Sequence, residues 1–276
     1  MIRQNFNADW TVEKGDGNSR MNSFLGNTQT KTVHLPYDAM IHEARTPDTK
    51  NGAQTGFYPG GEYIFQKHFT APQAWQGKPV SLVFEGVYQT ALVYLNGWLL
   101  TRNVNGYAEF TVEAGPYLKY GADNLLKVIA DNSLEPNSRW YTGSGIYRPV
   151  RLLVGNKVYL PQDTVRITTR EADEGFALLD VTAQVQSAST VTERVTLQQT
   201  ICREGTAVLT DRQNLLLQPG ESRTVSFRYC VDSPALWSPE NPNLYTSTMQ
   251  VLEGEEELDR EETSFGIRTL SIDAAH

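Results

Sequence analysis

The sequence contains few of the features that disulfide-rich, zinc-binding or membrane proteins require. Two cysteines, Cys202 and Cys230, are too few to build a disulfide framework in a chain of 276 residues. No CxxC motif or histidine pair stands near them, so we expect free thiols and no zinc site. The N-terminal stretch MIRQNFNADW lacks an apolar core, and no run of 18 apolar residues follows it, which predicts a cytoplasmic chain without a membrane span.

Positive charge is also scarce. The chain carries 24 Lys and Arg against 32 Asp and Glu, a net charge of −8. Proteins that bind a phosphate backbone carry clustered basic side chains, so a nucleic-acid partner is excluded. Part of the acidic excess lies in GEEELDREE (254–262), which we interpret as a solvated hairpin and not as a metal site, because charge runs mostly mark exposed faces. We expect neither a metal nor a cofactor.

Helical periodicity is nearly absent, and alternation with a period of two dominates the first half. Asn96-Gly97 lies between apolar residues in LNGWLL, a strong signal for a two-residue hairpin turn. The stretch from Trp10 to Gly61 is less regular and rich in Gly, Asn, Thr and Pro, which is typical of a functional or disordered loop. The alternating segments are EYIFQKHF (62–69), VSLVFEG (80–86), TALVYLNG (90–97), AEFTVEA (108–114), NLLKVIAD (124–131) and YRPVRLLVG (147–155). Together they predict an antiparallel sandwich with long loops.

The pattern changes between Gly155 and Pro161, where we place a domain boundary that divides the chain into residues 1–156 and 157–276. The second part has strands at short spacing with small turns, in roughly the 100 residues typical of an immunoglobulin-like sandwich. LWSPENPNLY (236–245) holds two prolines, which favour an extended linker between two strands over a central strand. The whole chain is predicted to be all-β.

One glycine-punctuated stretch, PNSRWYTGSGIYRPV (136–150), concentrates large amphipathic side chains. In a structural interpretation, Gly143 and Gly145 allow a tight bend into the next strand. In a second interpretation, the rings of Trp140 and Tyr141 stack on a pyranose face while nearby polar groups reach hydroxyls. In a third, the segment docks against another domain, since interfaces favour aromatics and Arg. The candidate carbohydrate-contact or docking residues are Asn137, Arg139, Trp140 and Tyr141, and we expect at least one of the two rings to be partly exposed.

The order of several motifs resembles glycoside hydrolase family 2, which includes β-galactosidases, β-glucuronidases and β-mannosidases. The motifs are GFYPGGEYIFQKHF, FEGVYQTALVYLNG, NSRWYTGSGIYRPVRL, LWSPENPNLY and FGIRTLSID, and they span nearly the whole chain. The resemblance implies a galactose-binding-like jelly roll (1–156), then an immunoglobulin-like sandwich (157–276), and then a (β/α)₈ barrel that carries both catalytic glutamates. Such a barrel needs about 250 residues, and none of this chain is left to form it. The resemblance therefore implies a non-catalytic N-terminal part of a retaining β-glycosidase, best matched to a β-galactosidase.

The residues themselves offer no catalytic pair. Retaining hydrolysis needs two carboxylates about 5–5.5 Å apart. The pairs Asp131/Glu135 and Glu43/Asp48 are close in sequence, but nothing in their surroundings predicts desolvation, so we interpret them as solvated loop carboxylates. No GxSxG motif accompanies the four histidines. We expect the chain alone to be inactive.

Three functional classes remain open from the sequence. The chain is part of a glycosidase, a free-standing carbohydrate-binding module, or a purely structural scaffold for the barrel. Expected partners are carbohydrate in the context of the full-length enzyme, the barrel itself and other copies in an oligomer. In related galactosidases an acidic side chain in the loop before this Trp touches the sugar, and residues 137–139 here do not match it, which speaks against galactose. A cationic Arg139 would suit either a carboxylated sugar or an acidic side chain of the barrel.

Overall fold

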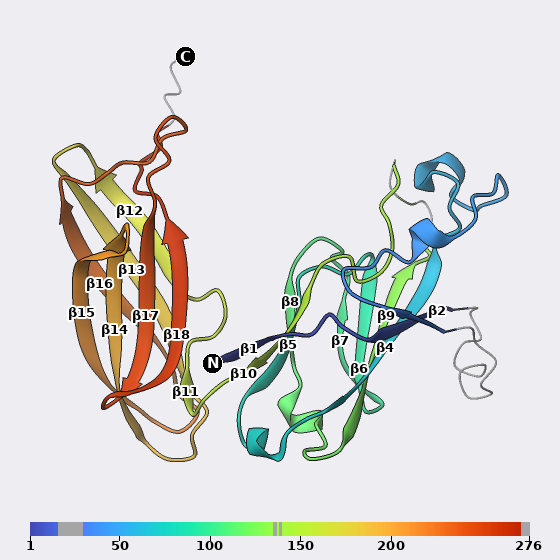
Figure 1. Cartoon of the computed structure of the whole chain (residues 1–276), viewed down its shortest axis with the longest axis horizontal. Coiled ribbons are helices and arrows are strands. Elements are labelled where there is room, and N and C mark those ends of the chain that lie inside the picture. The colour runs from blue at the N-terminus through green and yellow to red at the C-terminus, as the bar shows by residue number, and fades with distance from the viewer. Residues whose placement is uncertain (16–29, 135–136, 138–139, 272–276) are drawn as a thin grey trace. The chain divides into compact units, whose positions relative to one another are not determined.

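The computed structural model describes residues 1–15, 30–134, 137 and 140–271, and it divides into two compact units. One unit comprises Ile2–Val154, and the other comprises Gly155–His276 together with Met1. Both are built from antiparallel strands, and the helices among the described residues are 3₁₀ turns of three or four residues (Figure 1). The predicted all-β class is confirmed. No helix in the described part of the chain has the length and apolar character needed to cross a bilayer.

The first unit is a sandwich of two sheets, the predicted galactose-binding-like jelly roll. The smaller sheet has the order β1 (Ile2–Asn5), β10 (Val150–Val154), β5 (Val80–Phe84) and β8 (Phe110–Glu113). The larger sheet has the order β3 (Lys31–Val33), β2 (Trp10–Lys14), β4 (Gly61–Thr70), β9 (Asp123–Asn132), β6 (Thr90–Leu95) and β7 (Trp98–Asn103).

Alternating apolar residues from both sheets fill the core of this unit. Trp10, Phe65 and Phe84 are fully buried, and the Trp10 Nε1–H donates to the Phe6 carbonyl at 2.8 Å. Each large side chain removed from water in this way contributes about 1.5–3 kcal/mol. Burial of these side chains therefore holds the two sheets together, and the loops at the ends of the sheets are not needed to form this core.

The turn chemistry of this unit agrees with its sequence. The predicted hairpin joins β6 to β7, with Asn96 at φ 53° and Gly97 at φ 90°. Both turn residues adopt the positive φ that the shortest hairpins need. The irregular stretch between Trp10 and Gly61 holds more order than its composition suggests, because β2 and β3 lie inside it and pair with each other.

The second unit is the predicted immunoglobulin-like sandwich. In one sheet β13 (Phe176–Ser187) pairs with β11 (Val158–Tyr159), β12 (Arg166–Ala172) and β16 (Ser222–Asp232). The other has the order β15 (Thr206–Leu217), β14 (Glu193–Arg203), β17 (Tyr245–Glu253) and β18 (Glu256–Phe265). Burial alternates residue by residue along β13 and β16, as expected for strands with one face on the core. Cys202 and Cys230 are free thiols, which confirms that prediction.

Two sequence motifs of the second unit fold against each other. The Trp237 amide donates to the Ile267 carbonyl at 2.9 Å, and the Arg268 guanidinium lies 4.6 Å from the centre of the Trp237 ring. A Cβ on Gly266 would lie 2.8 Å from atoms of the same indole, so only glycine fits there. The proline-rich linker LWSPENPNLY and the FGIR strand end are therefore one packed structure.

The acidic segment 254–262 was predicted to be a solvated hairpin, and one of its carboxylates is buried instead. β17 and β18 meet at the turn Gly254–Glu255, and most of the acidic side chains that follow are exposed. Asp259, however, is 1% exposed, and its Oδ2 accepts a hydrogen bond from the Leu160 amide at 2.8 Å. A carboxylate that satisfies a buried amide is structural, and a charge-run argument alone does not find it.

Candidate functional site

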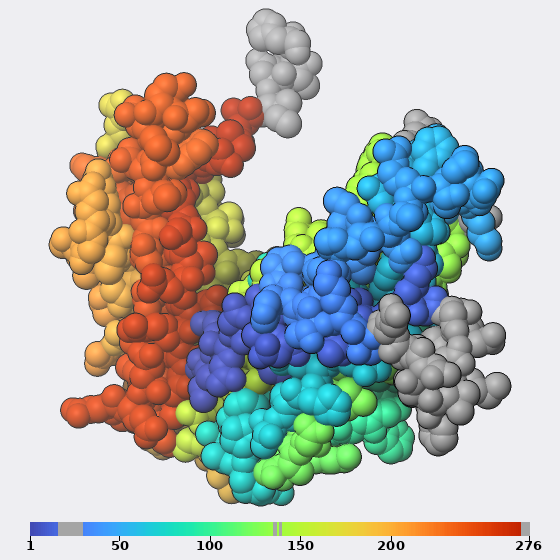
Figure 2. Space-filling model, turned by 45° about the vertical axis from the view of Figure 1, so that its right-hand side comes forward, coloured from blue at the N-terminus to red at the C-terminus, as the bar shows by residue number. Residues whose placement is uncertain are grey.

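Two segments of the first unit, far apart in sequence, lie side by side at one end of the sandwich. The first is the excursion between β3 and β4, which carries η1 (Met40–His42) and η2 (Gly52–Thr55); the second leads from β9 to β10. Backbone bonds join them, from the Tyr37 amide to the Ile146 carbonyl and from the Ala39 amide to the Ser144 carbonyl, each 2.8 Å. We call residues 37–58, with Asn137 and residues 140–146, the rim. Its excursion is the blue protrusion of Figure 1, and Figure 2 shows it as a raised part of the surface.

Glycine is required where the two segments touch. A Cβ on Gly145, at φ 137°, would lie 2.6 Å from the Tyr37 carbonyl oxygen, and one on Gly143 would lie 2.8 Å from the Asp38 carboxylate. No larger residue fits at such separations. The structural interpretation of these two glycines is confirmed.

Asp38 connects the two halves of the rim. Its Oδ1 accepts the amides of Met40 and Ser144, both at 3.0 Å, and its Oδ2 accepts the Tyr141 hydroxyl at 2.5 Å. Hydrogen bonds to a carboxylate are among the strongest in proteins. The sequence analysis missed this residue. The available signal was an Asp two residues ahead of a short apolar turn, the position from which an Asx side chain caps a backbone amide.

Tyr141 is half-buried against this carboxylate. Its ring meets Tyr58 edge to face, with centroids 5.1 Å apart. Burial, and then the hydrogen bond to Asp38, raises the pKa of the Tyr141 phenol far above its usual range. The phenol therefore stays protonated and acts as a fixed donor.

A chain of amides fixes Asn137. Its backbone N–H donates to Asn51 Oδ1 at 3.1 Å, and its Nδ2 donates to Asn132 Oδ1 at 2.7 Å. Asn132 is buried, and its own Nδ2 donates to the Gly143 carbonyl at 3.1 Å. The backbone N–H and the side-chain amide of Asn137 thus both donate to groups within the protein. Asn132, at the end of β9, was not singled out by the sequence analysis.

Trp140 is the most exposed aromatic among the described residues of the rim, with 62% of its surface accessible. The prediction that at least one of the rings of Trp140 and Tyr141 is partly exposed is confirmed. The fourth candidate, Arg139, lies outside the described residues. Of the four predicted residues, the structure thus brings Asn137, Trp140 and Tyr141 to the same rim.

The continuation of the segment is structural. Ser144 is buried, and its hydroxyl donates to the Tyr88 carbonyl at 3.1 Å. The Tyr147 hydroxyl donates to the Gly106 carbonyl at 2.8 Å. These contacts tie residues 144–147 to the neighbouring loops of the same unit.

Two of the carboxylates weighed as catalytic pairs can be placed as follows. Glu43 Oε2 lies 2.7 Å from Lys14 Nζ, in an ion pair, and Glu135 lies outside the described residues. Within the described ranges, no group of three or more His, Cys, Asp or Glu side chains is placed to hold a metal. The chemistry that the described rim offers is therefore an exposed indole on a braced support.

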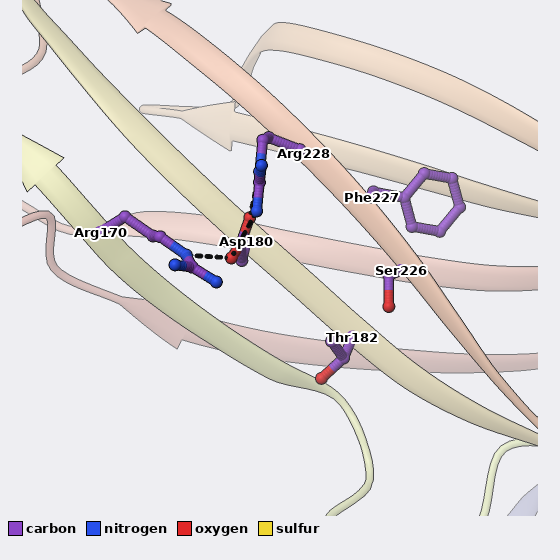
Figure 3. A pocket seen from close by; sticks show the side chains of 6 residues that line it. All are labelled: Arg170, Asp180, Thr182, Ser226, Phe227 and Arg228. Carbon is purple, nitrogen blue, oxygen red and sulfur yellow. Dashed lines mark hydrogen bonds and ion pairs between the residues drawn. The ribbon is translucent and has the colours of Figure 1, made fainter.

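A second polar cluster lies on the outer face of the second unit (Figure 3). Asp180 on β13 accepts bonds from Arg228 on β16, with Nε 2.8 Å from Oδ1, and from Arg170 on β12. Arg170 lies where the ladder of β12 and β13 shifts register between Thr169 and Glu171. Such a bulge re-aims a side chain. This cluster was not predicted from the sequence.

The electrostatics of this cluster favour an ion network and not catalysis. The hydrogen bonds from Arg228 and then Arg170 lower the pKa of Asp180 from 3.8 to about 2. Thr182 and Ser226 line the same hollow of about 400 Å³. A general acid needs a raised pKa near the working pH, whereas this carboxylate is held ionised between two cations.

Sequence comparison finds two family models. Residues 158–268 match the model described as glycosyl hydrolases family 2, and residues 10–177 match the glycosyl hydrolase 2 galactose-binding domain-like model. Among curated proteins, the chain is 34% identical to "Beta-galactosidase BoGH2A" of Bacteroides ovatus, over 99% of this chain and 32% of that protein. It is 30% identical to a "Putative beta-glucuronidase" of Formosa agariphila, over 98% of this chain and 25% of that protein. The chain thus spans about a third or less of the length of these relatives.

Solved structures give the same relation. A glycosyl hydrolase family 2 member from Bacteroides cellulosilyticus superposes with a TM-score of 0.90 at 29% identity, over 98% of this chain and 36% of that one. A putative beta-galactosidase from Bacteroides fragilis gives a TM-score of 0.87 at 28% identity, over 99% of this chain and 42% of that one. Both sandwiches, in the same succession along the chain, therefore occur in longer proteins.

Proposed function

Because the chain belongs to glycoside hydrolase family 2, we propose that it is the non-catalytic N-terminal part of a retaining β-glycosidase, in which its rim shapes the mouth of the substrate site. The relatives it matches are about three times as long or more, and Glu43, one of the carboxylates weighed for catalysis, is paired with Lys14. In the proposal, a further domain supplies the two catalytic carboxylates. We propose a β-galactoside as the substrate, following the 34% identical relative.

The exposure of Trp140 is the observation that carries the proposal. An indole with 62% of its surface in solvent is a large apolar face held on a braced segment. Trp is enriched at interfaces and among the residues that contribute most to binding. Sugar rings present C–H faces that stack on aromatic rings, while their hydroxyls need polar groups around them. Trp140 at the rim therefore suits contact with the substrate, with the catalytic domain, or with both.

The other candidate residues take supporting roles in this proposal. Tyr141 and Asn137 hold the segment to the excursion through Asp38 and Asn132, so that Trp140 is presented in one orientation. A rigid support matters because a misplaced contact loses much of its effect on the transition state. Direct contact of Asn137 or Arg139 with the sugar stays a prediction.

We also propose that the chain contributes to subunit contacts of the whole enzyme. β15 is an edge strand of the second unit, and it exposes Val208 and Leu216 with accessible fractions of 45% and 48%. Exposed edge strands with apolar side chains favour association with another chain. Light scattering of the enzyme, with Val208→Lys as the variant, tests this part; an unchanged mass would oppose it.

The test of the rim uses the whole enzyme that contains this chain. We expect Trp140→Ala to lower kcat/KM for a nitrophenyl β-galactoside by roughly tenfold, which equals about 1.4 kcal/mol of transition-state stabilisation. The matched control is Trp98→Ala, because Trp98 is 65% exposed on β7 of the same unit but lies outside the rim. Equal kinetics for the two variants would remove Trp140 from the site. Glycan titration of the chain alone separates the alternative of a free-standing binding module, which would bind without the further domain.

A further inference from the structure

The rim carries a shallow hollow beside Arg45 that is separate from Trp140. The hollow has a volume of about 340 Å³ and is lined by Arg45, Thr46, Pro47 and Phe57. Small-molecule sites commonly fall between about 300 and 1,000 Å³ and combine apolar walls with a few polar groups. The lining of this hollow has that composition, with one cation, one hydroxyl and two apolar rings.

Arg45 is held in place by neutral groups. Its Nε–H donates to the Gly56 carbonyl at 2.9 Å, and its guanidinium lies 6.0 Å and 5.8 Å from the ring centres of Phe57 and Tyr58. Arginine stacks favourably on aromatic faces at such distances. The side chain is therefore pre-organised without the help of an opposite charge.

No ion pair joins Arg45 to a carboxylate among the described residues. Asp38 and Glu43, the acids that precede it in the excursion, are bonded to Tyr141 and to Lys14 respectively. An ordered guanidinium that forms no ion pair with a described carboxylate has its terminal N–H groups available for an anion. A planar fork of this kind matches carboxylate and sulfate groups in a bidentate manner.

The backbone beside Arg45 is arranged to expose an aromatic ring. Phe57 has φ 66°, a left-handed conformation that a bulky residue rarely adopts, and its carbonyl accepts the Thr46 amide at 3.0 Å. The ring is 37% exposed next to Pro47. Unfavourable backbone conformations persist where the surroundings enforce them and often mark functional sites. Here the result is a flat apolar face next to a cation.

We propose that this hollow binds an acidic saccharide unit, with its carboxylate or sulfate group on Arg45 and its ring face on Phe57. The choice of a saccharide over another anion rests on the proposed function of the rim. The chain as a whole is acidic, with a net charge of −8, so anion binding has to come from a local site and not from the overall field. The proposal gives this hollow, and not the site of the β-galactoside, a preference for charged saccharide units over neutral ones.

The test is a titration of the ¹⁵N-labelled chain, followed by NMR at the Arg45 Nε–H and at the amides of Thr46 and Phe57. The probes are methyl β-glucuronide, galactose 6-sulfate, neutral methyl β-galactoside and sodium acetate. We expect at least one acidic saccharide to bind about tenfold or more tightly than the neutral one, and more weakly at high salt. Binding of the glucuronide alone identifies a carboxylate as the ligand group, and binding of the sulfate alone identifies a sulfate ester.

Substitutions at Arg45 and Phe57 distinguish the contribution of the cation to binding from that of the aromatic ring. Arg45→Gln is expected to reduce binding of the acidic saccharide about tenfold or more, and Arg45→Lys to reduce it less. Phe57→Leu should weaken saccharide binding but leave the weak effect of acetate unchanged. Arg102→Gln, at an exposed arginine on β7, is the matched control and should bind as the parent does.

Three results would overturn the inference. They are equal binding of acidic and neutral sugars, unchanged binding in Arg45→Gln, and acetate competing as well as the saccharides. Thermal unfolding of each variant verifies that the chain is folded. The titration uses the chain alone, whereas the kinetic test of Trp140 uses the whole enzyme. A negative titration therefore rejects the Arg45 site without deciding the role of Trp140.

Discussion

At the scale of single residues, Asp38 is the side chain on which the rim depends most. Its carboxylate accepts three hydrogen bonds from groups in both segments. Tyr141 donates one of them from a position 103 residues away in sequence. A contact of this range cannot be predicted from local pattern, because neither residue carries a signal that identifies its partner.

We predict that Tyr141→Phe lowers the free energy of unfolding by about 1.5–3 kcal/mol, the usual effect of losing a hydrogen bond to a charged group. Asp38→Ala removes the acceptor of this hydrogen bond. In that background, Tyr141→Phe should leave the free energy of unfolding almost unchanged. Urea denaturation of the four proteins of this double-mutant cycle measures the coupling.

The matched control is Tyr147→Phe, whose hydroxyl donates to the Gly106 carbonyl instead. Its effect should add to that of Asp38→Ala. Additive effects for Tyr141 as well would mean that the bond between Tyr141 and Asp38 does not stabilise the rim.

At the scale of elements, the close approach of the two rim segments requires glycine at position 145. We predict that Gly145→Ala destabilises the chain by roughly 3 kcal/mol or more, because it combines a glycine-only conformation with overlap on the Tyr37 carbonyl. The control is Gly220→Ala, at φ 70° with open space around it, which should cost about 1 kcal/mol. Thermal or urea unfolding gives both values, and equal costs would show that the segments do not touch as described.

The strands β12, β13 and β16 share the Asp180 network, which predicts a pH dependence of stability. The carboxyl has a pKa of about 2 in the folded chain against 3.8 ordinarily, so the unfolded chain binds its proton more readily. The stabilisation from Asp180 is therefore complete above about pH 4 and is lost as the pH falls toward 2.

The measurement is the difference in melting temperature between the parent chain and Asp180→Asn across this range. The difference should be constant above about pH 5 and shrink below pH 4. Asp232→Asn, at an exposed position on the neighbouring strand β16, controls for the loss of a surface carboxylate. A difference that grows as the pH falls would contradict the assignment.

The elements that the sequence predicts are those governed by local rules. The hairpin at Asn96-Gly97, the alternating strands and the proline linker depend on neighbouring residues. The Asp180 network was missed because its Arg170 lies at a bulge, and a bulge breaks the alternation on which the prediction of facing side chains rests. Arg45 was missed because its site forms only when the excursion folds back to bring Gly56 and Phe57 beside it.

At the scale of the whole molecule, the two sandwiches are each complete as folding units. Each has its own apolar core, of which Trp10 and Phe65 belong to the first unit and Leu179 and Met249 to the second. The motif order that resembles family 2 was predictable from sequence because several short segments occur in the same succession. The relation of the chain to a catalytic domain is a proposal that comes from the length of its relatives.

The most direct test of the central claim is a turnover assay with the purified chain alone. The substrates are nitrophenyl β-galactoside and nitrophenyl β-glucuronide, and a mock preparation serves as background. We predict no turnover above that background by the chain alone, and we predict hydrolysis of the galactoside by the whole enzyme. Turnover by the chain alone that co-purifies with it and is abolished by replacing one of its own carboxylates would contradict the account.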